Sequence, residues 1–387
     1  MKLTKLLLIG LIVISLAGCG GNANGSAASD APASAISNAS ATEYAVSEYP
    51  GFGNVYIHIS PSDFDKLGFE LGDSINLEFS NGAKFLDIPY YNGYYAKAGN
   101  VALVSYPGTQ YLIAAICNGG SLWQEASVDE NTTAKISLAE KKKYLIIQNA
   151  LDIYEFKNKK APDERAVFRE VKEGNLKEKI LYRGLSPLDV KNIGKSEKTV
   201  DDLIEEAGIK FIINLADTKE DAIEKIESGQ TDISYYKKLF DDGKVANIRL
   251  DMNYKSDAFA GKVVEVLKAI SENEGPYYIH CTEGKDRAGF VCMIIDCLAA
   301  ANYDEICDDY MKSYEYNFNI TKDATPDKYD VIKGETLDDM LRYIAGPDLE
   351  NIPLDGIDFV NVAGRYCDSH GMTDSDFDAL YQKLTRD

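Results

Sequence analysis

The chain has 387 residues, and its 62 acidic and 41 basic side chains give a formal net charge of -21. This length predicts two folded units plus an export segment, because one compact core rarely takes so many residues. The charge balance excludes a broadly basic surface, so nucleic acid is not expected as a partner. An anionic substrate must instead be held in a local basic pocket.

The N-terminus predicts export. Lys2 and Lys5 precede an apolar run, residues 6–16, which is too short to span a bilayer and is typical of a signal-peptide core. The run ends in LAGC, which resembles the lipobox of bacterial lipoproteins. The resemblance implies that residues 1–18 are removed and that Cys19 carries the lipid. Two acyl chains would then anchor the protein to the outer face of a bacterial cell membrane, with no other membrane contact expected.

An ordinary secretory signal with an incidental cysteine is the alternative. The small polar residues that follow cannot bury enough apolar surface to fold, and they predict a flexible tether over residues 19–47.

Residues 48–157 show short runs of alternating apolar residues separated by turn residues such as Asn81-Gly82, which predicts a small all-β domain, a barrel or sandwich. The segments FGNV, IPYYNGYYAKAGN and NGG loosely resemble the C-terminal β-barrel of the S-adenosylmethionine hydroxide adenosyltransferase family. The resemblance implies a fold and no catalytic activity. The tyrosines of this domain either form a ligand-binding face or are buried on strands; they include Tyr90, Tyr91, Tyr94 and Tyr95.

Residues 158–387 alternate short apolar runs, at 211–215 and 245–250, with longer helical patterns. This alternation predicts an α/β domain with a central, mostly parallel sheet flanked by helices. Residues 257–272 carry apolar side chains at helical spacing, with Asp257 as a plausible N-cap.

The clearest chemical signal lies between a predicted strand at 277–279 and a helical run at 291–300, in the sequence HCTEGKDRAGF. Backbone N–H groups in such a loop, together with the helix N-terminus, form an anion site. The positive potential favours the thiolate of Cys281 as a nucleophile. Arg287, six positions later, can grip two phosphoryl oxygens with its planar fork.

His280, Cys281, five residues and Arg287 match the signature of protein tyrosine phosphatases and dual-specificity phosphatases. The string GKDRAG is similar to the GKDRTG form of a bacterial branch that acts on phosphotyrosine, phosphoserine or phosphoinositides. Further matches follow the family's order: FREV at 168–171, LYRG at 181–184, the strand at 212–215, DYMKS at 309–313 and GMT at 371–373. The resemblance implies a phosphate site formed by Thr282, Glu283, Gly284, Lys285, Ala288 and His280.

The implied reaction needs neither metal nor other cofactor. Cys281 attacks phosphorus to give a phosphocysteine, the loop amides and Arg287 stabilise the transition state, and water releases phosphate. The general acid has three candidates. Asp251, directly after a strand, ranks first, Asp286 second, and Asp257 third with helix capping as its alternative role.

The substrate stays open among phosphotyrosine or phosphoserine proteins, phosphoinositides and inositol phosphates of the phytate type. Lys285 favours more than one phosphate, whereas Glu283 opposes it. Ala288 replaces a serine or threonine of most relatives, and Ala216 replaces a frequent arginine of this branch. The Ala288 departure keeps a non-catalytic phosphate-binding surface lipoprotein as an alternative. A sulfurtransferase fits the loop less well. The remaining cysteines after Cys19 are expected to be small core residues: Cys117, Cys292, Cys297, Cys307 and Cys367.

Overall fold

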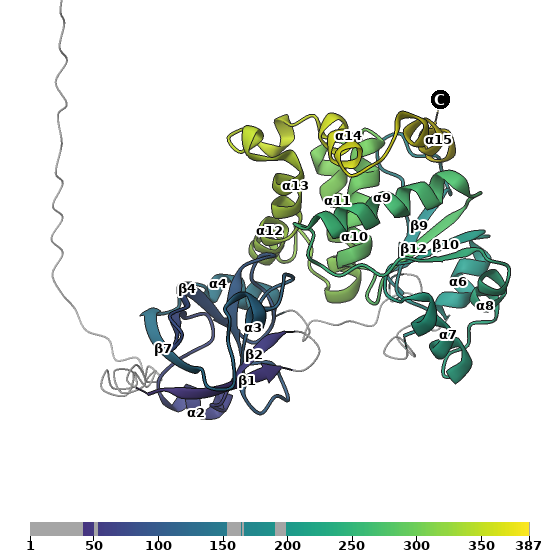
Figure 1. Cartoon of the computed structure of the whole chain (residues 1–387). Helices are drawn as coiled ribbons and strands as arrows, with labels where there is room; N and C mark the ends of the chain where they lie inside the picture. The colour runs from purple at the N-terminus through teal and green to yellow at the C-terminus, as the bar shows by residue number, and fades with distance from the viewer. Residues whose placement is uncertain (1–41, 50–52, 153–163, 165, 190–198, 387) are drawn as a thin grey trace, which may run out of the picture.

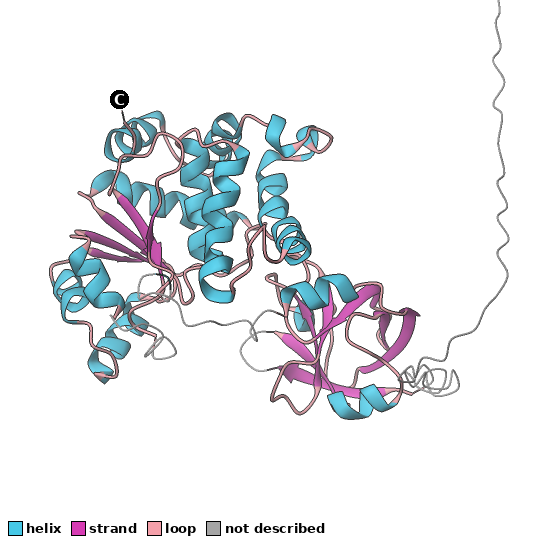
Figure 2. Ribbon diagram, turned by 180° about the vertical axis from the view of Figure 1, so that it is seen from behind, coloured by secondary structure: helices cyan, strands magenta, loops and turns pink. Residues whose placement is uncertain are grey.

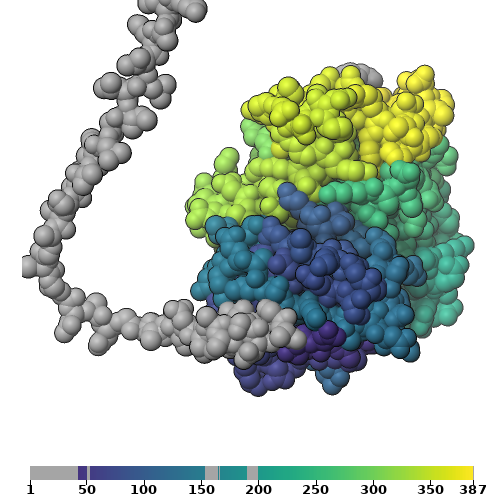
Figure 3. Space-filling model, turned by 60° about the vertical axis from the view of Figure 1, so that its left-hand side comes forward, coloured from purple at the N-terminus to yellow at the C-terminus, as the bar shows by residue number. Residues whose placement is uncertain are grey.

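The computed structural model of the chain describes residues 42–49, 53–152, 164, 166–189 and 199–386. The predicted signal peptide, the predicted lipid attachment site Cys19 and most of the predicted tether therefore lie outside the described residues. The described chain forms an N-terminal β-rich unit and a C-terminal α/β unit, which are in contact (Figures 1 and 3). Among the described helices, none is both long and apolar enough to cross a membrane.

The N-terminal unit is a closed seven-stranded barrel, as β1 pairs with both β2 and β7. Its strand order is β1-β2-β6-β5-β4-β3-β7, and all neighbours are antiparallel except β4 and β5. The strands are β1 (Tyr44–Tyr49), β2 (Asn54–Ile57), β3 (Ser74–Phe79), β4 (Lys84–Tyr91), β5 (Val101–Val104), β6 (Leu112–Ile116) and β7 (Thr133–Glu140). The prediction of a separate β-barrel at this end of the chain is confirmed.

Two details of that prediction were wrong. The unit is not all β, because it also contains α2 (Pro61–Lys66), α3 (Leu122–Glu125) and α4 (Leu145–Leu151). Residues 44–47, assigned to the tether, belong to β1. Only Val46 is buried in this strand, so the apolar alternation that reveals a strand is faint there.

The C-terminal unit is built on a five-stranded sheet in the order β11-β10-β12-β9-β8. Neighbours from β11 to β9 are parallel, and β8 is antiparallel to β9. The strands are β8 (Arg169–Glu170), β9 (Leu181–Gly184), β10 (Phe211–Asn214), β11 (Val245–Asn247) and β12 (Tyr277–His280). The central strand β12 therefore lies between β10 and β9.

Helices cover both faces of this sheet (Figure 2). Their bounds are α6 (Val200–Glu206), α7 (Lys219–Ser228), α8 (Ser234–Asp241), α9 (Asp257–Glu272), α10 (Asp286–Leu298), α11 (Tyr303–Phe318), α12 (Pro326–Glu335), α13 (Leu337–Ala345), η3 (Pro347–Leu349), η4 (Leu354–Gly356), α14 (Phe359–Ser369) and α15 (Asp374–Leu384). The predicted N-cap Asp257 is the first residue of α9. The cap is Ser256, whose hydroxyl accepts from the N–H of Phe259 at 3.2 Å.

Alternate side chains of the central strands enter two different cores. Ile212 and Tyr278 pack with the cluster formed by α6 to α8, whereas Ile213 and Ile279 pack with the cluster that includes α9 to α14. Strands buried on both faces are apolar without alternation, which explains the continuous run at 211–213. The barrel joins the second core through Ala98 and α4. The two units thus share buried apolar contacts.

Candidate active site

Cys281 lies directly after β12, at the head of a loop that ends where α10 begins at Asp286. Its residue surface is 2% exposed, and like the other described cysteines it is a free thiol. The expectation that the other described cysteines are buried core residues is confirmed. Gly284 has a φ of 65°, and a Cβ there would lie 2.4 Å from the backbone of Gly184. Only glycine fits this position of the loop.

Arg287, in the first turn of α10, is fixed beside this loop. Its Nη1 donates to the carbonyl oxygens of Leu215 at 3.1 Å and Leu250 at 3.3 Å, which follow β10 and β11. Its Nη2 donates to the hydroxyl of Thr282 at 2.8 Å. The guanidinium is therefore oriented by two strand ends and by the loop itself.

A second arginine holds the loop from outside. Arg183 of β9 is fully buried, and its Nη2 donates to the carbonyl oxygens of Gly284 at 3.1 Å and Lys285 at 3.0 Å. The C=O and N–H of a trans peptide point in opposite directions. The N–H groups that follow these two carbonyls therefore point away from Arg183, as an anion-binding loop requires.

Asp309 of α11 neutralises this arginine. Its carboxylate lies 2.6 Å from Nη1 of Arg183 and 3.0 Å from Nε of Arg169. The Nη2 of Arg169 also donates to the hydroxyl of Ser313 at 3.1 Å. Burial acts to raise the pKa of Asp309, but the two guanidinium groups outweigh it and the pKa is lowered. The pKa of Asp296, in α10, is shifted in the opposite direction. Burial, together with the charge of Asp309, raises it well above the usual range.

Sequence reasoning assigned no role to Arg169, Arg183 or Asp309, although it cited their segments as matches to the family pattern. The sequence did offer one signal, a charged residue within an apolar strand. Charged side chains are rarely buried unless they are paired, so such a residue indicates a buried ion pair. Arg183 stands in the strand sequence LYRG.

The structure separates the predicted phosphate-site residues into two groups. The side chains of His280 and Ala288 are fully buried, so they lie behind the loop. His280 packs between the rings of Tyr236 and Tyr278, and burial lowers its pKa to about 4 although the carboxylate of Asp217 acts against this shift. The others lie on the loop: Thr282, Glu283 and Lys285 are half-buried, and Gly284 is buried.

The three candidate acids occupy different surroundings. Asp286 has a side chain that is 39% exposed, and it lies 3.6 Å from the ammonium group of Lys285. Asp251 is exposed and accepts from the N–H of Asn253 at 2.9 Å. Asp257 is fully exposed and lies 3.7 Å from the ring of His370. Asp286 therefore lies at the end of the loop itself, Asp251 follows Leu250, whose carbonyl oxygen accepts from Arg287, and Asp257 lies beside His370.

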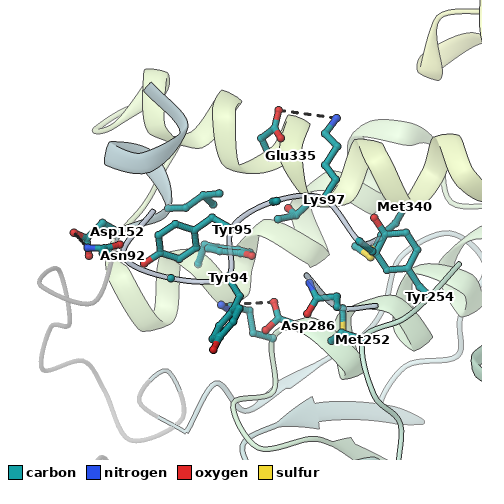
Figure 4. A pocket seen from close by; sticks show the side chains of 18 of the residues that line it. Asn92, Tyr94, Tyr95, Lys97, Asp152, Met252, Tyr254, Asp286, Glu335 and Met340 are labelled. Atoms are coloured by element: carbon teal, nitrogen blue, oxygen red, sulfur yellow. Dashed lines mark hydrogen bonds and ion pairs between the residues drawn. The ribbon is translucent and has the colours of Figure 1, made fainter. Parts of the chain in front are cut away.

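A cavity of about 580 Å³ reaches the loop at Lys285 and Asp286 and extends to the barrel (Figure 4). Tyr94 and Tyr95 line it, whereas Tyr90 and Tyr91 are buried in the barrel. In the part of the chain that the structure describes, no three His, Cys, Asp or Glu side chains gather closely enough to hold a metal ion.

Replacing Asp309 by asparagine tests the buried support of the loop. We expect Asp309→Asn to lower the free energy of unfolding by about 3–5 kcal/mol, because two buried guanidinium groups lose their counter-ion. Urea unfolding of the full chain measures this loss. Asp308→Asn, an exposed neighbour on the same helix, should change stability by no more than about 0.5 kcal/mol. Equal effects of both variants would contradict the network.

Comparison with known proteins agrees with this geometry. The chain matches the model of a tyrosine phosphatase family over residues 167–386. A search of curated proteins finds no match. Among solved structures, an uncharacterized conserved protein from Thermotoga maritima is 21% identical to this chain. The match covers 24% of this chain and 35% of that chain, and its TM-score is 0.22, so it does not indicate a shared fold. The adenosyltransferase resemblance of the barrel stays a prediction. Since the family match spans more than half of the 387 residues, the chain belongs to the tyrosine phosphatase family.

Proposed function

We propose that this chain hydrolyses phosphomonoesters without a metal ion, through a phosphocysteine intermediate formed on Cys281. One observation carries the proposal: a free thiol stands at the head of a loop whose carbonyls are bound by Arg183 and beside which Arg287 is fixed. This arrangement holds amide donors and a guanidinium before any substrate binds. Donors fixed in advance stabilise developing charge without reorganising during the reaction.

The proposed reaction has two steps. The thiolate attacks phosphorus in line, so an S–P bond forms while the P–O bond to the leaving group breaks and the leaving oxygen takes a proton from an acid. In the second step the carboxylate left by that acid takes a proton from a water molecule as its oxygen attacks phosphorus, the S–P bond breaks to return the thiolate, and phosphate leaves. The loop amides and the Arg287 fork stabilise the equatorial oxygens in both steps.

Asp286 is the acid that the geometry favours. Its carboxyl group is half-buried at the loop and lines the cavity in which a leaving group can lie. The carboxylate of Asp251 is exposed and already accepts a backbone hydrogen bond from Asn253. Asp251 follows Leu250, whose carbonyl holds Arg287, so it remains the alternative.

Phosphotyrosine proteins, phosphoserine proteins and phosphoinositides are the substrates of this proposal, with inositol phosphates as the alternative. A non-catalytic phosphate-binding protein is the second candidate. The buried Ala288 favours it, because no hydroxyl stands there to stabilise a departing thiolate.

The nucleophile is tested with p-nitrophenyl phosphate. Turnover by the full chain should persist in chelator and disappear in Cys281→Ser, because a hydroxyl is a far weaker nucleophile than a thiolate in this site. Cys117→Ala, which removes a buried thiol of the barrel, should keep activity. Unchanged turnover in Cys281→Ser would rule out the mechanism. Vanadate binding without phosphate release from any substrate would favour the non-catalytic candidate.

The acid is tested with two leaving groups. Asp286→Asn should lower kcat on phenyl phosphate by about 10²-fold or more, because a basic phenolate needs a proton as it departs. The loss on p-nitrophenyl phosphate should be smaller, since that leaving group departs readily as an anion. Asp251→Asn is the matched comparison. If only Asp251→Asn shows this dependence on the leaving group, Asp251 is the acid.

The proposed lipid anchor rests on the LAGC sequence. In a bacterial host, the full chain should incorporate labelled palmitate and fractionate with membranes. Cys19→Ala should abolish both, because the variant has no thiol for the thioether bond. Lipid labelling that survives the substitution would contradict the anchor.

A further inference from the structure

The cavity at the loop is built by both units. One wall is the barrel segment 92–98, which lies in the connection between β4 and β5, and the facing wall comes from Lys285, Asp286 and residues of α11 to α13. In Figure 4 the side chains of Tyr94, Asp286 and Met252 lie on one side of this segment, and Lys97 extends on the other side toward Glu335. The barrel thus borders the same space as the proposed acid.

The segment is fixed at both ends. At its start, the amide of Asn92 donates to Asp152 at 2.8 Å and accepts from Gln148 at 2.8 Å. At its end, the ammonium group of Lys97 lies 3.5 Å from Asp339 and 4.0 Å from Glu335. The first contacts lie within the barrel unit and the second join it to α12 and α13, so the segment is tied to both units.

The lining is rich in aromatic rings. Six tyrosines face the cavity, from both units: Tyr94, Tyr95, Tyr106, Tyr254, Tyr310 and Tyr314. Met252 and Met340 add polarizable apolar surface. Offset or edge-to-face packing with such rings favours an aromatic group over an aliphatic one.

The charges of the lining disfavour a second phosphate. Three carboxyl groups, of Asp152, Asp286 and Glu335, face two ammonium groups. Each ammonium group already has an acidic neighbour, because Lys97 lies beside Glu335 and Lys285 lies 3.6 Å from Asp286 and 5.1 Å from the ring centre of Tyr314. An additional phosphate in this space would meet more negative than positive charge.

We propose that barrel segment 92–98 is a specificity-determining wall for the leaving group, accepting an aromatic group and rejecting one that bears a second phosphate. The inference rests on the proposed function, since a general acid must lie at the leaving oxygen and Asp286 lines this cavity. Tyr94 is the central residue of the wall. It is half-buried, and its ring lies 5.7 Å from that of Tyr106.

Two peptides that differ only in phosphotyrosine or phosphoserine test the aromatic wall. In the full chain, Tyr94→Ala should lower kcat/KM on the phosphotyrosine peptide about 3- to 10-fold and change that on the phosphoserine peptide less than about twofold. Tyr111→Ala, a half-buried barrel tyrosine that packs on His58, should change neither value. The phosphoserine rate also shows that the variant is folded.

The charge of the wall is tested separately with myo-inositol hexakisphosphate. The wild-type chain should hydrolyse it with a lower kcat/KM than the phosphotyrosine peptide. Glu335→Gln should raise that value several-fold, because it removes one of the three carboxylates that line the cavity and one of the two acidic neighbours of Lys97. Equal losses on both peptides in Tyr94→Ala, or a wild-type preference for the hexakisphosphate, would overturn the inference while Cys281-dependent turnover stands. No turnover of any ester by the wild type would instead remove the proposed function.

Discussion

The buried guanidinium of Arg183 is the interaction on which the candidate site depends. It binds two carbonyl oxygens of the nucleophile loop and so sets the direction in which the loop amides point. A charge in this position would be strongly unfavourable without a partner, and Asp309 supplies one at 2.6 Å. Arg169 of β8 also donates to Asp309 and to the hydroxyl of Ser313, so the same network links β8 to α11. The loop is therefore shaped by side chains that take no part in the proposed chemistry.

The parallel sheet brings the remaining parts to one edge. Cys281 follows β12, and the carbonyls that orient Arg287 follow β10 and β11 on one side of it. On the other side, Gly184 at the end of β9 lies so close to the loop that a Cβ on Gly284 would come within 2.4 Å of its backbone. Ligand sites at the carboxyl ends of parallel strands are the general rule for such sheets. Here the carbonyl oxygens that follow two of the strands orient Arg287, and the backbone of Gly184 packs closely against Gly284 of the loop.

Local features of this molecule could be predicted from the sequence, and distant ones could not. The strand, loop and helix around Cys281 are contiguous, so residue order alone indicates them, and the NG turn between β3 and β4 is local in the same way. Strand β1 escaped prediction because it buries only Val46. The cavity wall could not be predicted, because Lys97 contacts Glu335 and Asp339, which lie more than two hundred residues later in the chain. Hydrophobic periodicity does not indicate contacts between such distant residues. The cap of α9 was assigned one residue late, since serine and aspartate are both good caps.

The shifted pKa of Asp309 has a consequence for where the protein can work. A buried carboxyl with a lowered pKa stabilises the fold above its ordinary pKa, and this contribution fades only as the medium acidifies through the lowered value. Arginine keeps its proton throughout. The ion pair between Arg183 and Asp309 thus keeps both charges across the mildly acidic to alkaline range. An enzyme tethered outside the cell, as proposed, would meet changes of pH that the buffered cytoplasm does not, and the ion pair that supports its phosphate loop would keep its charges through them.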